Sequence, residues 1–436
     1  MKILVTGLCT LHWGRLQYGN IGNYYIIEPL FRELHRVFPE AEIVTTFQMT
    51  EEFIEKENIT VLPMDMYYSW QEDDLEKAEK EYIYVKEYYK NKNIDCSTAY
   101  IRSVKDSTLL INVSGDMWGD NAEHVGCNRF MVDLYKMRTA QLLGVKTVLF
   151  GGTPGPFTDD RTRNFAKEVF QNFDLVINRE PTSSINLKKW NFEMKKVKSF
   201  TCPAFLFNAA DKNEVIGVIK EENIVPLDER PLVGFTIGGF NMPVGPYDMW
   251  PRDDKQYETF VEMVEYIIEK TKGRVLLISH TNGFELPPNF KLINGRDYPI
   301  LKQLQEIIIK RGKVSKDQLL CVQYPHLPKI TKAIIGMCDM FVTGRVHASV
   351  AAITQHTPTI FITYEKNFIP STKMHGFASL VDMQNYVCEP RDITTMHKKI
   401  DECWEKRDEI SEHLKIKISE VQEMARMAFD EIRKIL

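Results

Sequence analysis

The sequence predicts an α/β fold built on two open parallel sheets, each covered by helices on both faces. Short apolar runs alternate with amphipathic segments along the chain, which is typical of parallel strands joined by crossover helices. The chain has 436 residues, more than one ordinary core accommodates. A loosely patterned stretch rich in Pro and Asp separates two such series. We therefore expect two domains in tandem.

The first series predicts an N-terminal domain at 1–205. Its apolar runs predict strands at Ile3–Thr6, Glu42–Thr46, Ile59–Pro63, Ser107–Ser114, Val145–Phe150 and Leu175–Asn178. Apolar residues at three- and four-residue spacing predict the intervening helices at Tyr24–Val37, Asn128–Leu143, Arg161–Gln171 and Ser183–Trp190.

An insert at 64–106 interrupts this alternation. Leu75, Ala78, Tyr82, Val85 and Tyr89 recur at helical spacing, so the insert is expected to contain a helix. Its aromatic side chains either pack that helix or stack on a sugar, and the sequence leaves both interpretations open. These residues are Tyr67, Tyr68, Trp70, Tyr82, Tyr84, Tyr88 and Tyr89.

A linker at 206–230 leads into a C-terminal domain at 231–394. The expected strands are Leu232–Ile237, Val275–Ser279, Leu320–Gln323, Met340–Thr343 and Thr359–Thr363. The expected helices are Gln256–Lys272, Ile300–Arg311, Leu327–Met337 and Ala348–Gln355. Such sheets bind ligands at the carboxyl ends of their strands, so the residues that follow each strand are the candidates for a site.

A helical segment at 395–436 completes the chain. Residues from Ile410 to Ile435 trace one apolar face, and we expect that face to pack back onto the domains. A coiled coil is the alternative interpretation.

Charge and composition exclude several classes of protein. The formal net charge is -5, which disfavours nonspecific binding to nucleic acid. The first apolar run is too short for a signal peptide, and no apolar stretch is long enough to cross a membrane. The eight cysteines form no Cys-x-x-Cys pair, which disfavours a zinc or dithiol site. We therefore expect a cytoplasmic protein without a bound metal.

Three polar clusters follow predicted strands in the N-terminal half. Gly19, Asn20 and Gly22 precede a helix, where small residues let an anion approach the backbone. They match neither the dinucleotide-binding nor the Walker pattern, and a plain turn is the alternative. Asp116 follows the strand at Ser107–Ser114 and is either a ligand contact or a turn cap.

The third of these clusters contains Arg179 and Ser183 and follows the strand at Leu175–Asn178. An arginine at the end of a strand suits binding of an anion through its planar fork. An ion pair with Glu180 at the surface is the alternative.

The most specific cluster lies in the C-terminal half. Gly344, Arg345 and His347 follow the strand Met340–Thr343 and precede an Ala-rich helix. A guanidinium binds phosphate or carboxylate, and an adjacent imidazole can transfer a proton near neutral pH. Tyr364 and Lys366 follow the next strand and offer a phenol and an ammonium to the same edge.

Taken in this order, the clusters resemble the polysaccharide pyruvyl transferase family from Gly19 to Lys366. The most specific part is Gly-Arg-x-His-Ala at 344–348 with Tyr-x-Lys at 364–366. Further support comes from Gly-Asn-x-Gly at 19–22, Gly-Pro at 155–156 and Arg-x-x-x-Ser at 179–183. The resemblance implies two Rossmann-like domains that face each other across a cleft, as in GT-B glycosyltransferases, with the C-terminal helix returning to the first.

The resemblance also implies an activity. Family members transfer pyruvate from phosphoenolpyruvate to two hydroxyls of a sugar, forming a ketal in a cell-surface polysaccharide or its precursor. The partners would be phosphoenolpyruvate, on the C-terminal side, and a sugar or lipid-linked glycan acceptor, on the N-terminal side, with no cofactor. A homo-oligomer and a transient contact with a membrane surface stay open.

Roles for individual residues follow from that chemistry. Arg345, Arg179 and Lys366 would bind the anionic groups of phosphoenolpyruvate. His347 would be the general acid, and His347 or Asp116 the base for the attacking hydroxyl. The other expected substrate-binding residues are Tyr364, Gly344, Asn20, Gly19, Gly22 and Ser183.

Two other functions remain as alternatives. A nucleotide-sugar glycosyltransferase on the same fold would use the same cations for a diphosphate. A non-catalytic, sugar-binding homologue would retain the pocket without the chemistry.

Overall fold

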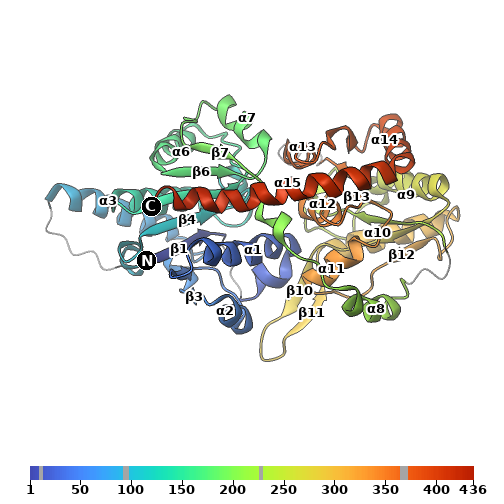
Figure 1. Ribbon diagram of the computed structural model, residues 1–436, viewed down its shortest axis with the longest axis horizontal. Coiled ribbons are helices and arrows are strands. Elements are labelled where there is room, and N and C mark those ends of the chain that lie inside the picture. The colour runs from blue at the N-terminus through green and yellow to red at the C-terminus, as the bar shows by residue number, and fades with distance from the viewer. Residues whose placement is uncertain (9–12, 92–97, 225–228, 364–371) are drawn as a thin grey trace. The chain divides into compact units, whose positions relative to one another are not determined.

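The computed structural model describes residues 1–8, 13–91, 98–224, 229–363 and 372–436. The chain forms two compact units. Unit 1 comprises Met1–Leu16, Glu28–Pro203 and Met424–Leu436, and unit 2 comprises Gln17–Ile27 and Ala204–Glu423. Each unit is built on a parallel sheet of its own (Figure 1). The predicted fold class is thereby confirmed.

The sheet of unit 1 has seven strands in the order β3-β2-β1-β4-β5-β6-β7. Every neighbouring pair is parallel. All five residues of β4 are buried, as expected for a sheet covered on both faces. The strands are β1 Lys2–Gly7, β2 Glu42–Thr45, β3 Thr60–Val61, β4 Leu109–Val113, β5 Lys146–Gly152, β6 Leu175–Asn178 and β7 Val197–Ser199.

The helices of unit 1 are α2 Glu51–Glu57, α3 Asp74–Asn91, α4 Ala99–Lys105, α5 Arg129–Leu142, α6 Asp160–Asn172 and α7 Pro181–Lys189. Those predicted from periodicity are confirmed within three residues at each end. Strand β3 is shorter than the predicted Ile59–Pro63, because proline has no N–H to donate to a strand ladder.

The insert contains α3, as predicted. Tyr67 and Tyr68 just before it are both buried. The hydroxyl of Tyr67 donates to Asp133, and that of Tyr68 donates to the carbonyl of Cys127 at 2.8 Å. These two rings therefore pack the unit's core and offer no open face to a sugar. The side chains of Tyr88 and Tyr89 lie outside the described residues.

Trp118 is the largest fully buried side chain and organises the core of unit 1. The ring centroids of five phenylalanines lie 5.4–6.2 Å from its own. These are Phe130, Phe157, Phe170, Phe173 and Phe192. Trp118 belongs to the polar cluster that follows β4, so packing of this ring holds the neighbouring Asp116 segment on the sheet edge.

The sheet of unit 2 has six parallel strands in the order β12-β9-β8-β13-β14-β15. They are β8 Leu232–Thr236, β9 Arg274–Leu277, β12 Leu319–Cys321, β13 Met340–Thr343, β14 Thr359–Ile362 and β15 Val387–Cys388. The helices are α8 Lys212–Glu221, α9 Glu258–Thr271, α10 Asp297–Arg311, α11 Pro328–Ile335, α12 Val346–Ile353, α13 Thr372–Ser379 and α14 Ile393–Glu405.

Several features of unit 2 were not predicted, among them helix α13, strand β15, a hairpin and helix α8. Strands β10 Asn282–Glu285 and β11 Lys291–Asn294 pair as an antiparallel hairpin. Pro287 and Pro288 lie in the turn between these two strands. Helix α8 lies inside the segment predicted as a linker. Its buried Val215 and Ile219 lie four residues apart, the helical spacing that the surrounding prolines and aspartates obscured.

Two long helices contribute residues to both units. Helix α1, Ile21–Val37, is divided at Glu28, next to Pro29 inside the helix. Helix α15, Arg407–Arg433, is divided at Met424. Its apolar face is buried from Ile410 to Ile432, which confirms that the tail packs as part of the fold.

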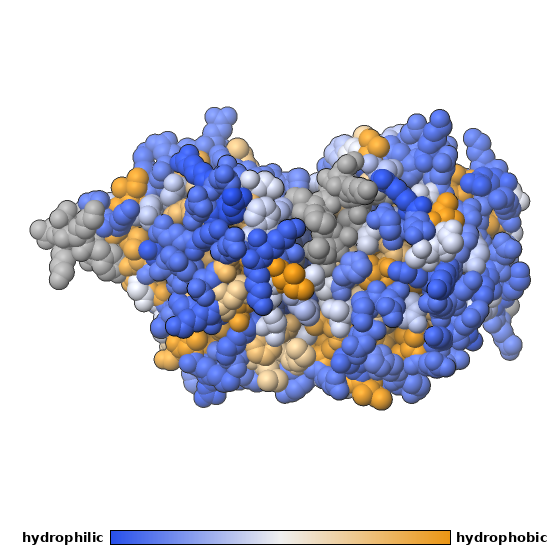
Figure 2. Space-filling model, turned by 90° about the horizontal axis from the view of Figure 1, so that it is seen from above, coloured by the Kyte–Doolittle hydropathy of each residue, from blue (hydrophilic) through white to orange (hydrophobic). Residues whose placement is uncertain are grey.

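The face of the molecule shown in Figure 2 is predominantly polar. On the face shown in Figure 2, hydrophobic residues occur in small, separate patches among hydrophilic ones. In the parts of the chain that the structure describes, no helix combines the length and apolar character needed to cross a bilayer.

The burial pattern of α15 predicts that two neighbouring side chains differ greatly in their contribution to the free energy of unfolding. Phe429 is fully buried and its ring centroid lies 4.7 Å from that of Phe150, whereas Met427 is 45% exposed. Phe429→Ala should lower the free energy of unfolding by about 3–5 kcal/mol, because it leaves a cavity. Met427→Ala should change it by less than about 0.5 kcal/mol. Urea unfolding measures both, and equal effects would show that α15 is an appendage.

Candidate functional site

The carboxyl ends of three neighbouring strands in unit 2 carry the strongest candidate site. Strands β9, β8 and β13 are adjacent in the sheet, so the segments that follow them meet at one edge. His280 follows β9, Gly238 and Asn241 follow β8, and Arg345 follows β13. This edge is where open α/β sheets bind their ligands.

Arg345 is held at this edge by a buried carboxylate. Its guanidinium donates to Asp297, the first residue of α10. The side chain of Asp297 is fully buried, and that of Arg345 is 12% exposed. The second oxygen of Asp297 accepts from the backbone N–H of His280 at 3.3 Å. A guanidinium carries five N–H groups, so this contact is compatible with a further bidentate contact to an anion.

The loops after β8 and β13 pack closely because glycines leave room for polar side chains. The Asn241 amide donates to the carbonyl of Gly344 at 3.3 Å and accepts from the N–H of Gly238 at 3.0 Å. A Cβ on Gly344 would lie 2.1 Å from that amide, and one on Gly238 would lie 2.6 Å from the Arg345 guanidinium. The two glycines thus fix where Arg345 can lie.

His347 lies in the first turn of α12 and against the first turn of α1. A Cβ on Gly22 would lie 2.6 Å from Nδ1 of His347. The Gly22 N–H donates to the Asn20 side chain at 3.2 Å, and Asn20 forms an antiparallel bridge with Thr281. The predicted Gly-Asn-x-Gly turn therefore lies beside His347 within unit 2, although it is far away in the sequence.

His280 is a buried histidine of this edge that the sequence analysis did not single out. Its ring lies edge-on to that of Tyr25, with centroids 5.4 Å apart. Burial, followed by the positive charges of Arg345 and His347, lowers the pKa of His280 well below its usual value of 6.5. His280 is therefore a neutral imidazole at pH 7.

Unit 1 carries a second group of predicted residues at its own carboxyl edge. Arg179 is 3% exposed, and its Nε donates to the hydroxyl of Thr153 at 2.8 Å. A Cβ on Gly115 would lie 3.8 Å from its guanidinium, so Gly115, which precedes the half-buried Asp116, lies close to Arg179. The structure brings the segments after β4, β5 and β6 together here.

The immediate neighbours of Arg179 have a structural role. Glu180 caps α7, because its carboxylate accepts from the N–H groups of Thr182 and Ser183. The hydroxyl of Ser183 also donates to this carboxylate. The surface position that the alternative interpretation gave to these two residues is wrong, because Arg179 and Glu180 are both buried.

The predicted site residues thus fall into three sets. Gly22, Asn20, Gly344, Arg345 and His347 are brought together in unit 2, with Gly19 just before Asn20 at the end of a short π-helix. Unit 1 holds Arg179, Ser183 and Asp116. Tyr364 and Lys366 lie outside the described residues.

Sequence reasoning missed Asp297, His280 and Asn241. His280 could have been found, since it follows a predicted strand as the other candidates do. Asp297 carried no comparable signal, because it follows the hairpin and precedes the predicted start of its helix at Ile300.

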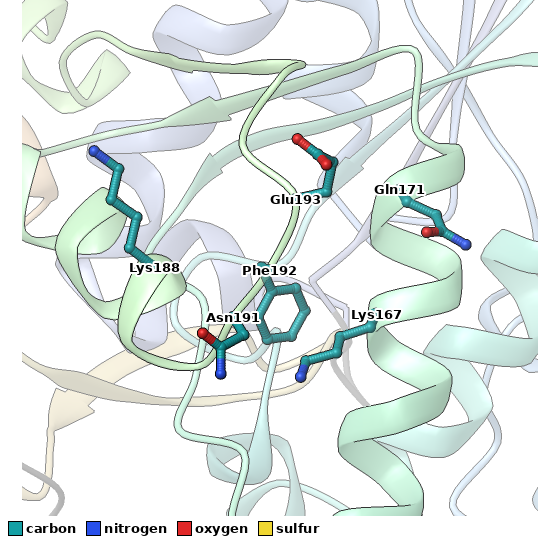
Figure 3. Close-up of a pocket in the computed structure, with 6 residues that line it drawn as sticks. All are labelled: Lys167, Gln171, Lys188, Asn191, Phe192 and Glu193. Atoms are coloured by element: carbon teal, nitrogen blue, oxygen red, sulfur yellow. The ribbon is translucent and has the colours of Figure 1, made fainter.

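A separate, open pocket of about 440 Å³ lies in unit 1. Figure 3 shows that α6, α7 and the loop after α7 supply its residues. Helix α6 leads into β6 and α7 leads into β7, so this pocket lies toward the amino edge of the sheet, opposite Arg179. The lining residues are Lys167, Gln171, Lys188, Asn191, Phe192 and Glu193.

No metal site is evident in the described part of the chain, where no three His, Cys, Asp or Glu side chains gather as ligands.

Solved structures resemble this chain along most of its length. A glycosyltransferase from Rickettsia africae ESF-5 has a TM-score of 0.61 at 9% identity, over 100% of this chain and 98% of that chain. Anabaena Alr3699/HepE in complex with UDP has a TM-score of 0.58 at 11% identity, over 100% and 99%. UDP-GlcNAc 2-epimerase from Methanocaldococcus jannaschii has a TM-score of 0.52 at 15% identity, over 92% of each chain. At such identities the likeness concerns the fold, which is of the GT-B class.

The family model of polysaccharide pyruvyl transferase matches residues 20–366. The matched stretch begins at Asn20, includes the Arg345 and His347 edge and extends through most of both units. With a match over so much of the sequence, the chain belongs to the polysaccharide pyruvyl transferase family and is a transferase.

Proposed function

We propose that this protein transfers pyruvate from phosphoenolpyruvate to two hydroxyls of a sugar, forming a ketal and releasing phosphate. The observation that carries the proposal is the Arg345 guanidinium, held by Asp297 at a sheet edge beside His347. A donor with a phosphate and a carboxylate requires fixed cationic groups with defined direction. A sugar or lipid-linked glycan is the proposed acceptor.

The proposed reaction begins with a proton transfer. A general acid protonates the methylene carbon of phosphoenolpyruvate, and cationic character develops at the neighbouring carbon, which bears the phosphate oxygen. One sugar hydroxyl attacks that carbon and loses its proton to a base. The second hydroxyl then attacks the same carbon, the bond to phosphate breaks, and phosphate leaves with the electron pair. The proton of the second hydroxyl passes to the leaving phosphate, so protons balance over the reaction.

We assign the roles by chemistry. Arg345 binds an anionic group of the donor, and His347 supplies the first proton, which suits an imidazole near neutral pH. Arg179 in unit 1 provides a second buried guanidinium, and Asp116 provides a carboxylate to act as base. Lys366 and Tyr364 complete the proposed set of substrate contacts.

Donor binding tests this proposal directly. Millimolar phosphoenolpyruvate should raise the melting temperature, because a ligand that binds only the native state stabilises it by mass action. Matched additions of inorganic phosphate and UDP-glucose are the controls in differential scanning fluorimetry. A shift with UDP-glucose and none with phosphoenolpyruvate would favour the glycosyltransferase alternative.

Two substitutions should separate binding from chemistry. Arg345→Ala is a poor choice, because it leaves the buried Asp297 carboxylate unpaired and destabilises the fold. Arg345→Lys keeps the charge, loses the planar fork, and should weaken donor binding by about 1.5–3 kcal/mol. His347→Ala should retain donor binding while turnover falls by about 100-fold or more. Calorimetry and phosphate release measure the two effects, and normal turnover in His347→Ala would refute its role as the acid.

The close approach of Gly22 to the His347 ring gives a further prediction. Gly22→Ala places a methyl group against the His347 ring, so turnover should fall at least about tenfold, since small misplacements of catalytic groups are costly. Gly217→Ala in α8 is the matched control, because a Cβ there meets nothing within 4 Å. Phosphate release measures both variants. Equal activities would mean that His347 does not depend on its contact with the α1 turn.

A further inference from the structure

The structure contains a buried imidazole nitrogen that the proposed mechanism has not yet used. His280 is 1% exposed, and its Nε2 has no hydrogen-bond partner among the described residues. Burying a polar atom without a partner disfavours folding, and native structures rarely retain such atoms without a reason. The position of this one, at the edge that carries Arg345 and His347, suggests what the reason is.

We propose that Nε2 of His280 donates a hydrogen bond to an anionic oxygen of the donor substrate, which makes His280 a third residue of the donor site with Arg345 and His347. The proposal rests on the proposed function, since it assumes that the donor binds at this edge. It names a contact that the family motif at 344–348 does not include.

Backbone contacts fix the position of His280. It follows β9, and Arg345 follows β13, so the two flank the loop that follows the intervening β8. One carboxylate, that of Asp297, accepts from both the backbone of His280 and the guanidinium of Arg345. Tyr25 packs against the imidazole ring. The ring is therefore placed by the same group that places the arginine.

The charge state of His280 suits the proposed contact. Arg345 and His347 are close enough for their positive charges to lower the pKa of His280, in addition to the effect of burial. A neutral imidazole can carry its proton on Nε2 and donate it, as a cationic one would. It does so without adding a third positive charge to a desolvated edge, so the edge avoids that repulsion.

The test uses two substitutions that affect the ring nitrogen differently. His280→Phe keeps an aromatic ring against Tyr25 and removes Nε2, whereas His280→Gln places an amide N–H near the position of Nε2. His413→Phe is the matched control, since that histidine lies on α15 and its Nε2 is 3.1 Å from the carbonyl oxygen of Val381, away from Arg345. Melting temperature and phosphoenolpyruvate affinity are measured for all three full-length variants.

The expected results differ between stability and binding. Without ligand, His280→Phe should melt at the same or a higher temperature than the wild type, because a buried polar atom without a partner has been removed. Its dissociation constant for phosphoenolpyruvate should rise about tenfold or more, and that of His280→Gln should rise much less. His413→Phe should bind as the wild type does. Loss of stability without loss of affinity in His280→Phe would overturn the proposal, because it would show a purely structural histidine.

Failure of this inference is distinguishable from failure of the proposed function. If phosphoenolpyruvate stabilises the wild type and His280→Phe binds it equally well, the inference is wrong and the proposed function stands. If the wild type responds to UDP-glucose instead, the proposed donor is wrong. The dissociation constants of His280→Phe and the wild type are then compared with UDP-glucose as the ligand, and their ratio decides whether His280 binds the anion. A wild type that responds to neither compound would refute both.

Discussion

The candidate site depends on one buried ion pair, between Asp297 at the start of α10 and Arg345 after β13. A charge removed from water is costly unless it is paired and hydrogen-bonded. Asp297 meets this requirement with contacts from several segments. It accepts from Arg345 and from the backbone of His280, and its own N–H donates to the Thr281 hydroxyl at 3.1 Å. The ends of β9 and β13 and the start of α10 are therefore held in register by a single carboxylate.

Around this pair, three glycines are as important as the polar side chains, because they leave room for them. Gly238 lies where any Cβ would meet the guanidinium, Gly344 where it would meet Asn241, and Gly22 where it would meet His347. None of the three has a positive φ angle, so their role is one of space and not of backbone conformation. Glycine is required here because polar side chains approach the backbone closely.

Unit 1 uses its sheet edge in a different way. Arg179 is oriented by the hydroxyl of Thr153, and the adjacent Glu180 is engaged in capping α7. The guanidinium of Arg345, by contrast, is held by the carboxylate of Asp297. Arg179 and Arg345 thus have different surroundings, although the sequence offers the same motif for both, an arginine just after a strand.

The sequence by itself determined the fold class, most strands and helices and the burial of the tail, because hydrophobic periodicity is a local property of the chain. Strands β6 and β13 have the bounds that their apolar runs predict. It also pointed to Arg345, His347 and Gly22, since strand ends mark ligand positions in such folds. Helix α8 and the β10–β11 hairpin were not predicted. Prolines lie near both, and proline breaks regular structure but also occurs at the ends of helices and strands.

Only the tertiary structure decided which residues meet. Asp297 lies 48 residues from Arg345 along the chain, and the two meet only because α10 begins beside the end of β13 in the folded unit. Gly22 reaches His347 because the segment Gln17–Ile27 packs into unit 2 and not with the rest of the N-terminal half. Burial of His280 and the depression of its pKa are likewise properties of its surroundings. Contacts between segments distant in sequence have no periodic signature, so only the folded chain shows them.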